Sequence, residues 1–165
     1  MKIYELNITQ RIDAPLEKVF DFFSKPENLA EITPSKLGFN ILTPSPIVME
    51  KGTLIDYTIK LFGIPVRWRT LITAYNPPEK FVDEQLKGPY SFWHHTHTFE
   101  AIDQGVEMKD IVRYSIPFGV LGRLLHFLWI KNDLKKIFNH RKKVIDKILV
   151  SNYKEKHKEI RDKQQ

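Results

Sequence analysis

Cysteine is absent from the 165-residue sequence. Disulfide bonds, zinc sites built on thiolates and thiol catalysis are therefore excluded. Long apolar runs are also missing, and no segment reaches the roughly 18 apolar residues that a membrane-spanning helix needs. Residues 1–12 alternate between apolar and polar side chains, unlike the continuous apolar centre of a signal peptide. These absences predict a soluble, cytoplasmic protein.

The length is that of one domain, because 165 residues can bury a core but are too few to predict two domains. No internal repeat, linker or low-complexity tract interrupts the chain. We assign residues 1–150 to a single domain. Residues 151–165 are polar and basic, and we expect them to form a tail that frays or extends into water.

The formal net charge of +6 is concentrated at the C-terminal end. Residues 131–165 hold 12 Lys and Arg against 5 Asp and Glu, whereas residues 1–130 hold 14 against 15. Such a segment can bind nucleic acid or an anionic membrane surface, but the solvated face of a helix explains it more simply. We therefore expect no nucleic-acid partner and leave open a peripheral contact with a membrane. The pattern favours no particular oligomeric state.

Hydrophobic periodicity predicts the first elements. Alternation over residues 3–12 indicates a strand, and the apolar stripe that follows indicates a helix over residues 14–23 with Asp13 as its N-cap. A second short helix is expected over residues 26–32, because prolines bound this segment on both sides. Residues 37–43 read as the next strand.

Two hairpins are expected in the middle of the chain. The first begins with a strand over residues 53–62, and a turn at Gly63-Ile64 would place Tyr57 opposite Thr70. The second covers residues 93–114, and a two-residue loop would create four opposed pairs. These are Trp93 with Tyr114, His95 with Val112, His97 with Asp110, and Phe99 with Met108. All four pairs fall on the apolar face, which supports this register. A longer loop at Gly105 would instead make His97 and Asp110 diagonal neighbours.

The order of elements predicts an α+β protein. One strand, two short helices and about six further antiparallel strands, including residues 81–87, precede a long helix from residue 117 to about residue 150. A curved antiparallel sheet of about seven strands can wrap around that helix and bury one face of each. The inward face is too aromatic and too polar to pack completely. It carries Tyr57, Trp68, Trp93, His95, His97, Asp110 and Tyr114. We therefore predict a cavity between the sheet and the helix.

Several motifs resemble a known superfamily. They are APLEKVFDFF at 14–23, F-x-D-x-Q at 81–85, W-x-H-x-H-x-F at 93–99, DIVRY at 110–114 and IFNHR at 137–141. On these residues the chain resembles the START/Bet v1-like superfamily, also called SRPBCC or helix-grip, over roughly residues 3–150. Within it, the motifs are similar to a bacterial cyclase/dehydrase-like, ligand-binding branch. The resemblance implies an apolar cavity for a lipid, sterol, polyketide or quinone, and in some members cyclisation or dehydration.

Three interpretations of the buried polar residues stay open. His95 and His97 could bind a metal, but Asp110 is the only obvious third ligand, so we expect no metal and no cofactor. His97 and Asp110 could act as a catalytic acid/base pair, with the carboxylate orienting the imidazole. The simplest interpretation is a buried pair whose partners satisfy each other and shape the pocket.

Further side chains are candidates for contact with a ligand. Together with His95, His97 and Asp110 they are Tyr57, Trp68, Gln85, Trp93, Tyr114 and Arg141. Arg141 could meet an anionic group, or pair with Asp83 or Asp110. The apolar run at 119–130 is expected to be buried, although its all-round apolar character also suits docking to a membrane or partner.

The leading hypothesis is a protein that binds, and in one version transports, a hydrophobic small molecule in an internal cavity. The first alternative is a cyclase or dehydratase that uses the His-Asp pair on such a molecule. The second is a module that docks to a membrane or a partner through its basic C-terminal helix.

Overall fold

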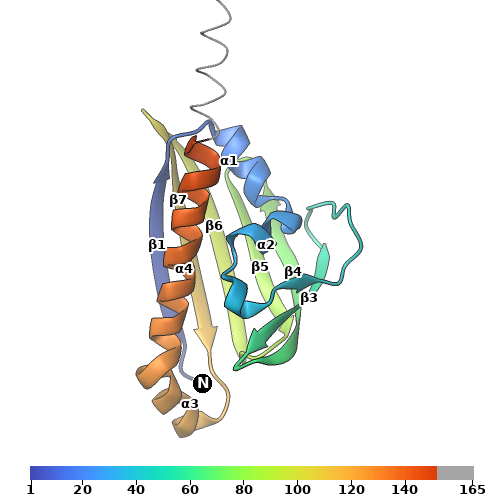
Figure 1. Cartoon of the computed structure of the whole chain (residues 1–165), viewed down its shortest axis with the longest axis vertical. Helices are drawn as coiled ribbons and strands as arrows, with labels where there is room; N and C mark the ends of the chain where they lie inside the picture. Colours follow the sequence, from blue (N-terminus) through green and yellow to red (C-terminus); the bar gives the residue numbers. More distant parts are fainter. Residues whose placement is uncertain (152–165) are drawn as a thin grey trace, which may run out of the picture.

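A seven-stranded antiparallel sheet is the framework of the computed structural model, which describes residues 1–151. The strands are β1 (Tyr4–Ile12), β2 (Asn40–Ile41), β3 (Leu54–Leu61), β4 (Ile64–Asn76), β5 (Lys80–Lys87), β6 (Phe92–Ile102) and β7 (Gly105–Ser115). Their order across the sheet is β1-β7-β6-β5-β4-β3-β2, so the first strand closes one edge beside the last. Figure 1 shows the sheet curving around a long helix. The predicted α+β helix-grip fold is confirmed.

The helices lie on one face of the sheet (Figure 1). Those between β1 and β2 are α1 (Leu16–Phe23), η1 (Pro26–Asn28), α2 (Leu29–Ile32) and η2 (Ser35–Leu37). The C-terminal helix is continuous from α3 (Gly119–Leu125) through η3 (His126–Ile130) and α4 (Lys131–Ile145) to η4 (Asp146–Ser151). The segments η3 and η4 are π-helical, which shifts the side-chain register relative to a plain α-helix. The predicted tail at 151–165 lies outside the described residues, apart from the backbone of Ser151.

Two local predictions for the first part of the chain were wrong. Pro15, not Asp13, occupies the N-cap position of α1, because its extended backbone immediately precedes the first helical residue. Only residues 40–41 of the segment 37–43 form a strand, since a 3-10 turn ends at Leu37 and Gly38 then takes a left-handed φ of 48°.

The turn between β3 and β4 also differs from the prediction. Phe62 and Gly63 occupy it with φ of 54° and 80°, as a tight two-residue hairpin requires. Tyr57 therefore faces Trp68, and not Thr70. Because the shift is two residues, the inward and outward faces are unchanged.

The hairpin of β6 and β7 has the predicted register. Its loop consists of Asp103 and Gln104 between the paired residues Ile102 and Gly105. Gly105 has φ of 106°, and a Cβ atom there would lie 2.1 Å from the Ile12 carbonyl oxygen at the end of β1. Only glycine fits this crossing without displacing the backbone.

The apolar core is divided into two clusters along the helix. One cluster joins α1 to the start of β5, the end of β6, the start of β7 and Ile145. The other joins the tryptophans of β4 and β6 to Leu134 and Phe138 of α4. Figure 1 shows α4 crossing the sheet lengthwise, so both clusters lie under one helix. Among residues 1–151, no helix is long and apolar enough to cross a membrane.

Candidate functional site

Two adjoining hollows lie between the sheet and the helices. The inner hollow has a volume of about 130 Å³ and reaches His95 and His97. The outer hollow has a volume of about 340 Å³ and runs toward η3. Five residues line both spaces and form the boundary between them: Leu29, Tyr57, Trp68, Trp93 and Arg141. The outer space alone falls within the roughly 300–1,000 Å³ that is usual for small-molecule sites.

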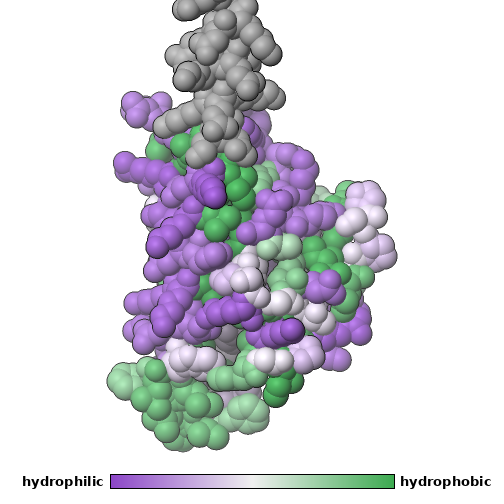
Figure 2. All heavy atoms as spheres, viewed as in Figure 1, coloured by the Kyte–Doolittle hydropathy of each residue, from purple (hydrophilic) through white to green (hydrophobic). Residues whose placement is uncertain are grey.

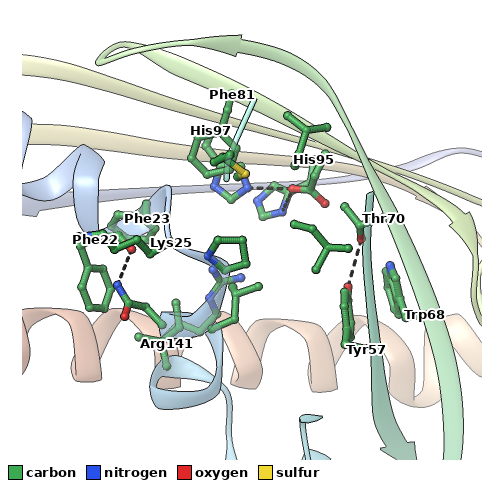
Figure 3. A pocket seen from close by; sticks show the side chains of 18 of the residues that line it. Phe22, Phe23, Lys25, Tyr57, Trp68, Thr70, Phe81, His95, His97 and Arg141 are labelled. Atoms are coloured by element: carbon green, nitrogen blue, oxygen red, sulfur yellow. Dashed lines mark hydrogen bonds and ion pairs between the residues drawn. The ribbon is translucent and has the colours of Figure 1, made fainter. Parts of the chain in front are cut away.

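A cluster of two histidines and two aspartates lies on the sheet side of the inner hollow, and Asp83, His95 and His97 line it. We call these three residues and Asp110 the polar quartet. Figure 3 shows His95 and His97 projecting from the sheet toward the helix. His95 Nε2 lies 2.8 Å from Asp110 Oδ1, and His97 Nε2 lies 2.9 Å from Asp83 Oδ2. Because ionised carboxylates only accept hydrogen bonds, the imidazole N–H donates in both.

Each imidazole also approaches the second aspartate. His95 Nδ1 lies 3.3 Å from Asp83 Oδ2, and His97 Nδ1 lies 2.9 Å from Asp110 Oδ1. The second contact lacks hydrogen-bond alignment, so His97 Nδ1 is a buried nitrogen without a hydrogen bond among the described residues. The four side chains are thus closely packed, and the His97 Nδ1 nitrogen is left without a hydrogen bond among the described residues.

Opposed charges hold His95 and the two aspartates of the quartet in their ionised forms. Burial by itself raises the pKa of the Asp83 carboxyl, but the charge and hydrogen bonds of His95 and His97 outweigh burial and hold that pKa well below its usual range. Burial and the same two histidines act on Asp110 in the same way, and the histidines again hold its pKa well below its usual range. Burial lowers the pKa of His95, whereas the charge of Asp83 and the bond to Asp110 raise it to about 9. The pair of buried carboxylates therefore stabilises a proton on His95 at neutral pH.

The quartet lies where the two apolar clusters meet. The ring of His97 stacks on Phe81 with centroids 4.1 Å apart, and the ring of His95 meets Phe138 edge-on at 5.6 Å. Both imidazoles are 4% exposed. Ionised groups in such surroundings are tolerated only when they pair, and the four-residue arrangement supplies that pairing.

Aromatic side chains line the rest of the boundary. Tyr57 Oη lies 3.4 Å from the Thr70 hydroxyl, a contact marked by a dashed line in Figure 3. Burial raises the pKa of Tyr57 above its usual value. Trp68 stacks beside Tyr57 with ring centroids 5.8 Å apart. The Nε1 atom of Trp68 is buried without a hydrogen-bond partner among the described residues. Buried donors are normally paired, so this N–H is an exception in a residue that lines both hollows.

Arg141 approaches the boundary from the helix side (Figure 3). Its guanidinium carbon lies 5.2 Å from the centre of the Phe138 ring. The described residues show no ion pair between Arg141 and either Asp83 or Asp110, which was one of the two roles that the sequence left open for it. The charge therefore remains available to a group bound in the hollows.

Three predicted contact residues lie behind the walls of both hollows. The amide of Gln85 holds the peptide of Tyr90, with Nε2 2.7 Å from its carbonyl oxygen. Tyr114 is buried, and its hydroxyl lies 2.9 Å from His126 Nε2. Asp110 orients His95 from behind. These residues shape the site without lining it.

Asp83 is the main site residue that the sequence interpretation missed. Residues 81–87 alternate ambiguously, because Phe81 and Val82 are both apolar and both buried. The pairing of Asp83 with His95 across β5 and β6 resolves the ambiguity, since paired residues share a face. The motif F-x-D-x-Q was the available signal, and it placed Asp83 and Gln85 beside Phe81.

The same residues decide whether a metal ion could be held. Nitrogen and carboxylate atoms of Asp83, His95 and His97 all lie within 4.8 Å of one another, which is the donor set of a two-histidine, one-carboxylate site. However, His97 Nε2 and Asp83 Oδ2 are already in direct contact at 2.9 Å. To bind one metal, the imidazole nitrogen would have to give up this hydrogen bond, and both groups would have to turn toward the ion. The present geometry is that of hydrogen-bonded ion pairs.

A curved sheet that grips a helix over an aromatic hollow is the helix-grip fold, and the family match places the chain in the START/Bet v1-like superfamily. The chain belongs to the polyketide cyclase/dehydrase and lipid transport family, whose model matches residues 12–134. The search among curated proteins gave no match.

Solved structures agree with this fold at low sequence identity. TTHA0849 from Thermus thermophilus aligns with a TM-score of 0.72 at 15% identity, over 90% of this chain and 99% of that one. Ara h 8.0201 aligns with a TM-score of 0.64 at 17% identity, over 91% and 99%. The di-domain ARO/CYC StfQ from the steffimycin biosynthetic pathway aligns with a TM-score of 0.70 at 11% identity, over 92% of this chain and 52% of that one.

Proposed function

We propose that the protein binds a hydrophobic small molecule, with the apolar body in the outer hollow and a polar group at the inner one. The carrying observation is the boundary between the hollows, where aromatic walls meet the polar quartet. An apolar body gains free energy by leaving water, at about 25 cal/mol per Å² of surface buried. A polar end would be left without partners in a purely apolar space, and here partners exist.

The available groups favour a ligand that ends in a hydrogen-bond acceptor or an anion. Trp68 Nε1 is a buried donor without a partner among the described residues, and Arg141 faces the same boundary with its charge unpaired by either nearby aspartate. A carbonyl, a phenolate or a carboxylate would satisfy these groups. Polyketides, quinones, sterol-like molecules and lipids all combine such an end with an apolar body, and transport of the bound molecule is the extension of this proposal.

Ligand capture tests the proposal directly. Native mass spectrometry of freshly purified protein should show a bound hydrophobic compound, and the neutral dye N-phenyl-1-naphthylamine should bind with enhanced fluorescence. Leu29→Trp should reduce dye affinity at least tenfold, because Leu29 lines both hollows and a larger side chain fills them. Leu86→Trp is the matched control, since Leu86 is exposed on β5 and lines neither hollow. Equal affinity for the two variants would argue against an internal site.

A cyclase or dehydratase is the second candidate, favoured by the state of His97. Its Nε2 is fixed by Asp83, whereas Nδ1 lies beside Asp110 without a hydrogen bond. An imidazole oriented by carboxylates at the wall of a hollow is the usual arrangement for moving a proton to or from a ligand. Incubation with hydroxylated polyketide-like ketones, followed by mass spectrometry, should reveal loss of one water. His97→Ala should abolish the dehydration and retain dye binding. If the variant neither dehydrates the ketone nor binds the dye, the role of His97 is structural.

A further inference from the structure

The end of the molecule that holds α3 and the β3–β4 turn is covered by apolar side chains. Figure 2 shows it as a hydrophobic cap below a largely hydrophilic body. The exposed members are Phe62, Ile64, Phe118, Val120, Leu121, Leu124, Leu125, Phe127, Leu128 and Trp129, and we call them the apolar end. Phe127 is 76% exposed, so the expectation that residues 119–130 are buried was wrong. Proteins rarely leave so many neighbouring apolar side chains in water without a binding role.

The two parts of the apolar end are in contact. The ring centroids of Phe62, in the β3–β4 turn, and Trp129, in η3, lie 4.2 Å apart. The opposite side of this helix is anchored: His126 meets the Tyr114 hydroxyl at 2.9 Å and stacks on Tyr4 at 3.5 Å. The apolar side chains are therefore held outward by a fixed polar anchor. They form part of the surface of this fold.

The outer hollow opens within this surface. Phe62, Phe118, Leu125 and Trp129 belong to the apolar end and also line the hollow. A molecule entering from here would pass from one apolar environment to another. The same arrangement would expose it to water if nothing covered the apolar end.

Charge indicates which kind of surface covers it. Residues 116–132 contain no Asp or Glu, and they carry Arg123 and Lys131. Lys2 and Arg123 line a surface hollow together, directly beside α3. A second copy of this chain would bring like charges together across a symmetric contact. The chain's own last residues, 152–165, contain a single aliphatic side chain, Ile160, and cannot supply an apolar cover by composition.

We infer that the apolar end inserts into the surface of an anionic lipid bilayer and places the mouth of the outer hollow against the lipid. Aromatic and aliphatic side chains enter the boundary of the acyl region, while the basic residues beside them meet anionic headgroups. The inference rests on the proposed function in one respect, that the bilayer is the source or destination of the ligand. Docking itself requires only the surface.

Vesicle flotation tests the inference with the full chain. Vesicles of phosphatidylcholine with one-fifth phosphatidylglycerol should bind the protein more strongly than pure phosphatidylcholine vesicles. Binding should weaken but persist in 0.5 M NaCl, where the Debye length is about 4 Å and charge attraction between exposed groups is largely screened. Phe127→Glu with Leu128→Glu should reduce the bound fraction at least tenfold. These two side chains are exposed and do not line the outer hollow, so the fold and the ligand site are spared.

The control variant carries the same added charge elsewhere. Val48→Glu with Leu86→Glu changes two exposed apolar residues outside the apolar end, one of them 71% exposed, and should bind vesicles like the unchanged chain. Insertion also has an optical signature. Trp129 is 41% exposed, whereas Trp68 and Trp93 are 6% and 8% exposed, so brominated phospholipid should quench Trp129 selectively. Trp129→Phe should remove the quenched component.

Four outcomes would overturn the inference. They are absence of vesicle binding, binding that salt abolishes without any quenching, equal loss in the control variant, and a dimer that the Phe127 and Leu128 substitutions dissociate. The last would assign the surface to a second copy. N-phenyl-1-naphthylamine binding, measured on every variant without vesicles, separates this result from the proposed function. If a variant still binds the dye but no longer binds vesicles, the proposed ligand site is unaffected. If the protein binds vesicles but not the dye, the docking surface is supported and the ligand site is not.

Discussion

Asp110 faces His97 across the β6–β7 ladder, yet its aligned hydrogen bond, 2.8 Å long, goes to His95. Asp83 shows the converse pattern. It faces His95 across β5 and β6, but it accepts its aligned hydrogen bond from His97. Each carboxylate thus bonds to the diagonal imidazole. The crossed arrangement ties three strands together through side chains, on the face that lines the inner hollow.

Removal of one negative charge from the quartet should destabilise the fold. Asp110→Asn keeps the shape of the side chain but leaves His95 and His97 with one carboxylate between them. Breaking a buried ion pair from one side typically costs about 3–5 kcal/mol. Urea unfolding at pH 7 should show a loss of that order. Glu107→Gln, on the outward face of the same strand, should change the unfolding free energy by less than about 1 kcal/mol. Similar losses for the two variants would contradict the assigned pairing.

Stability should fall as the pH rises from about 6.5 toward 9. The folded pKa of His95 is raised to about 9, above the usual value of 6.5, by Asp83 and Asp110. A raised folded pKa means that the stabilisation is fully present below pH 6.5 and is lost as the pH passes through the folded value. The loss should be on the order of 3 kcal/mol. Unfolding free energies measured between pH 6 and pH 10 would check this.

Acid should remove a different contribution. The folded pKa values of Asp83 and Asp110 are depressed, so their stabilisation is present above the ordinary value of about 4 and disappears as the pH falls below it. The quartet should therefore be most stabilising between about pH 4 and pH 6.5. A stability profile that rises steadily from pH 6 to pH 9 would be incompatible with a protonated His95 between two ionised aspartates.

Arg141 should discriminate between ligands by charge. Two probes share one apolar skeleton: 1-anilinonaphthalene-8-sulfonate is anionic, and N-phenyl-1-naphthylamine lacks the sulfonate. Arg141→Met should weaken the anionic probe about tenfold or more and leave the neutral probe within about twofold, because a charge-assisted hydrogen bond contributes about 1.5–3 kcal/mol. Arg123→Met is the control, since Arg123 lies on α3 and lines neither of the two site hollows. Fluorescence titration of both dyes on both variants gives the comparison, and parallel losses would mean that Arg141 serves packing alone.

Local patterns predicted most of the fold because its long elements follow one period each. The β6–β7 register followed from the coincidence of apolar, aromatic and polar pairs on one face, and the structure has it. The β3–β4 register did not, because Phe62 is an unusual residue for a turn that needs a positive φ. Helical periodicity at 119–130 marked a helix correctly. It could not distinguish burial from exposure, since that segment is apolar on every side.

The candidate site was predicted less completely for a geometric reason. Strand alternation assigns a face, but it does not say which neighbour a side chain bonds to or how deep a residue lies. His95, His97, Tyr57, Trp68 and Trp93 were placed on the inward face, and they line the hollows. Asp110 and Tyr114 share that face but lie behind the walls, because the first is covered by the imidazoles and the second is turned toward His126. Asp83 required knowledge of the β5–β6 pairing.

The anchor between the sheet and η3 should control how firmly the apolar end is held. Tyr114→Phe removes the hydroxyl that meets His126 and leaves a buried imidazole nitrogen unpaired, which should lower the unfolding free energy by about 1–3 kcal/mol. Because this hydrogen bond ties η3 directly to β7, amide exchange should accelerate most over residues 119–130. Tyr75→Phe, which alters a half-buried tyrosine packed on Phe20, should leave exchange in that segment unchanged. Acceleration spread evenly over the chain would show that the Tyr114 hydroxyl stabilises the fold as a whole. Acceleration confined to α3 and η3 would identify it as the fixed point that keeps the apolar side chains outward.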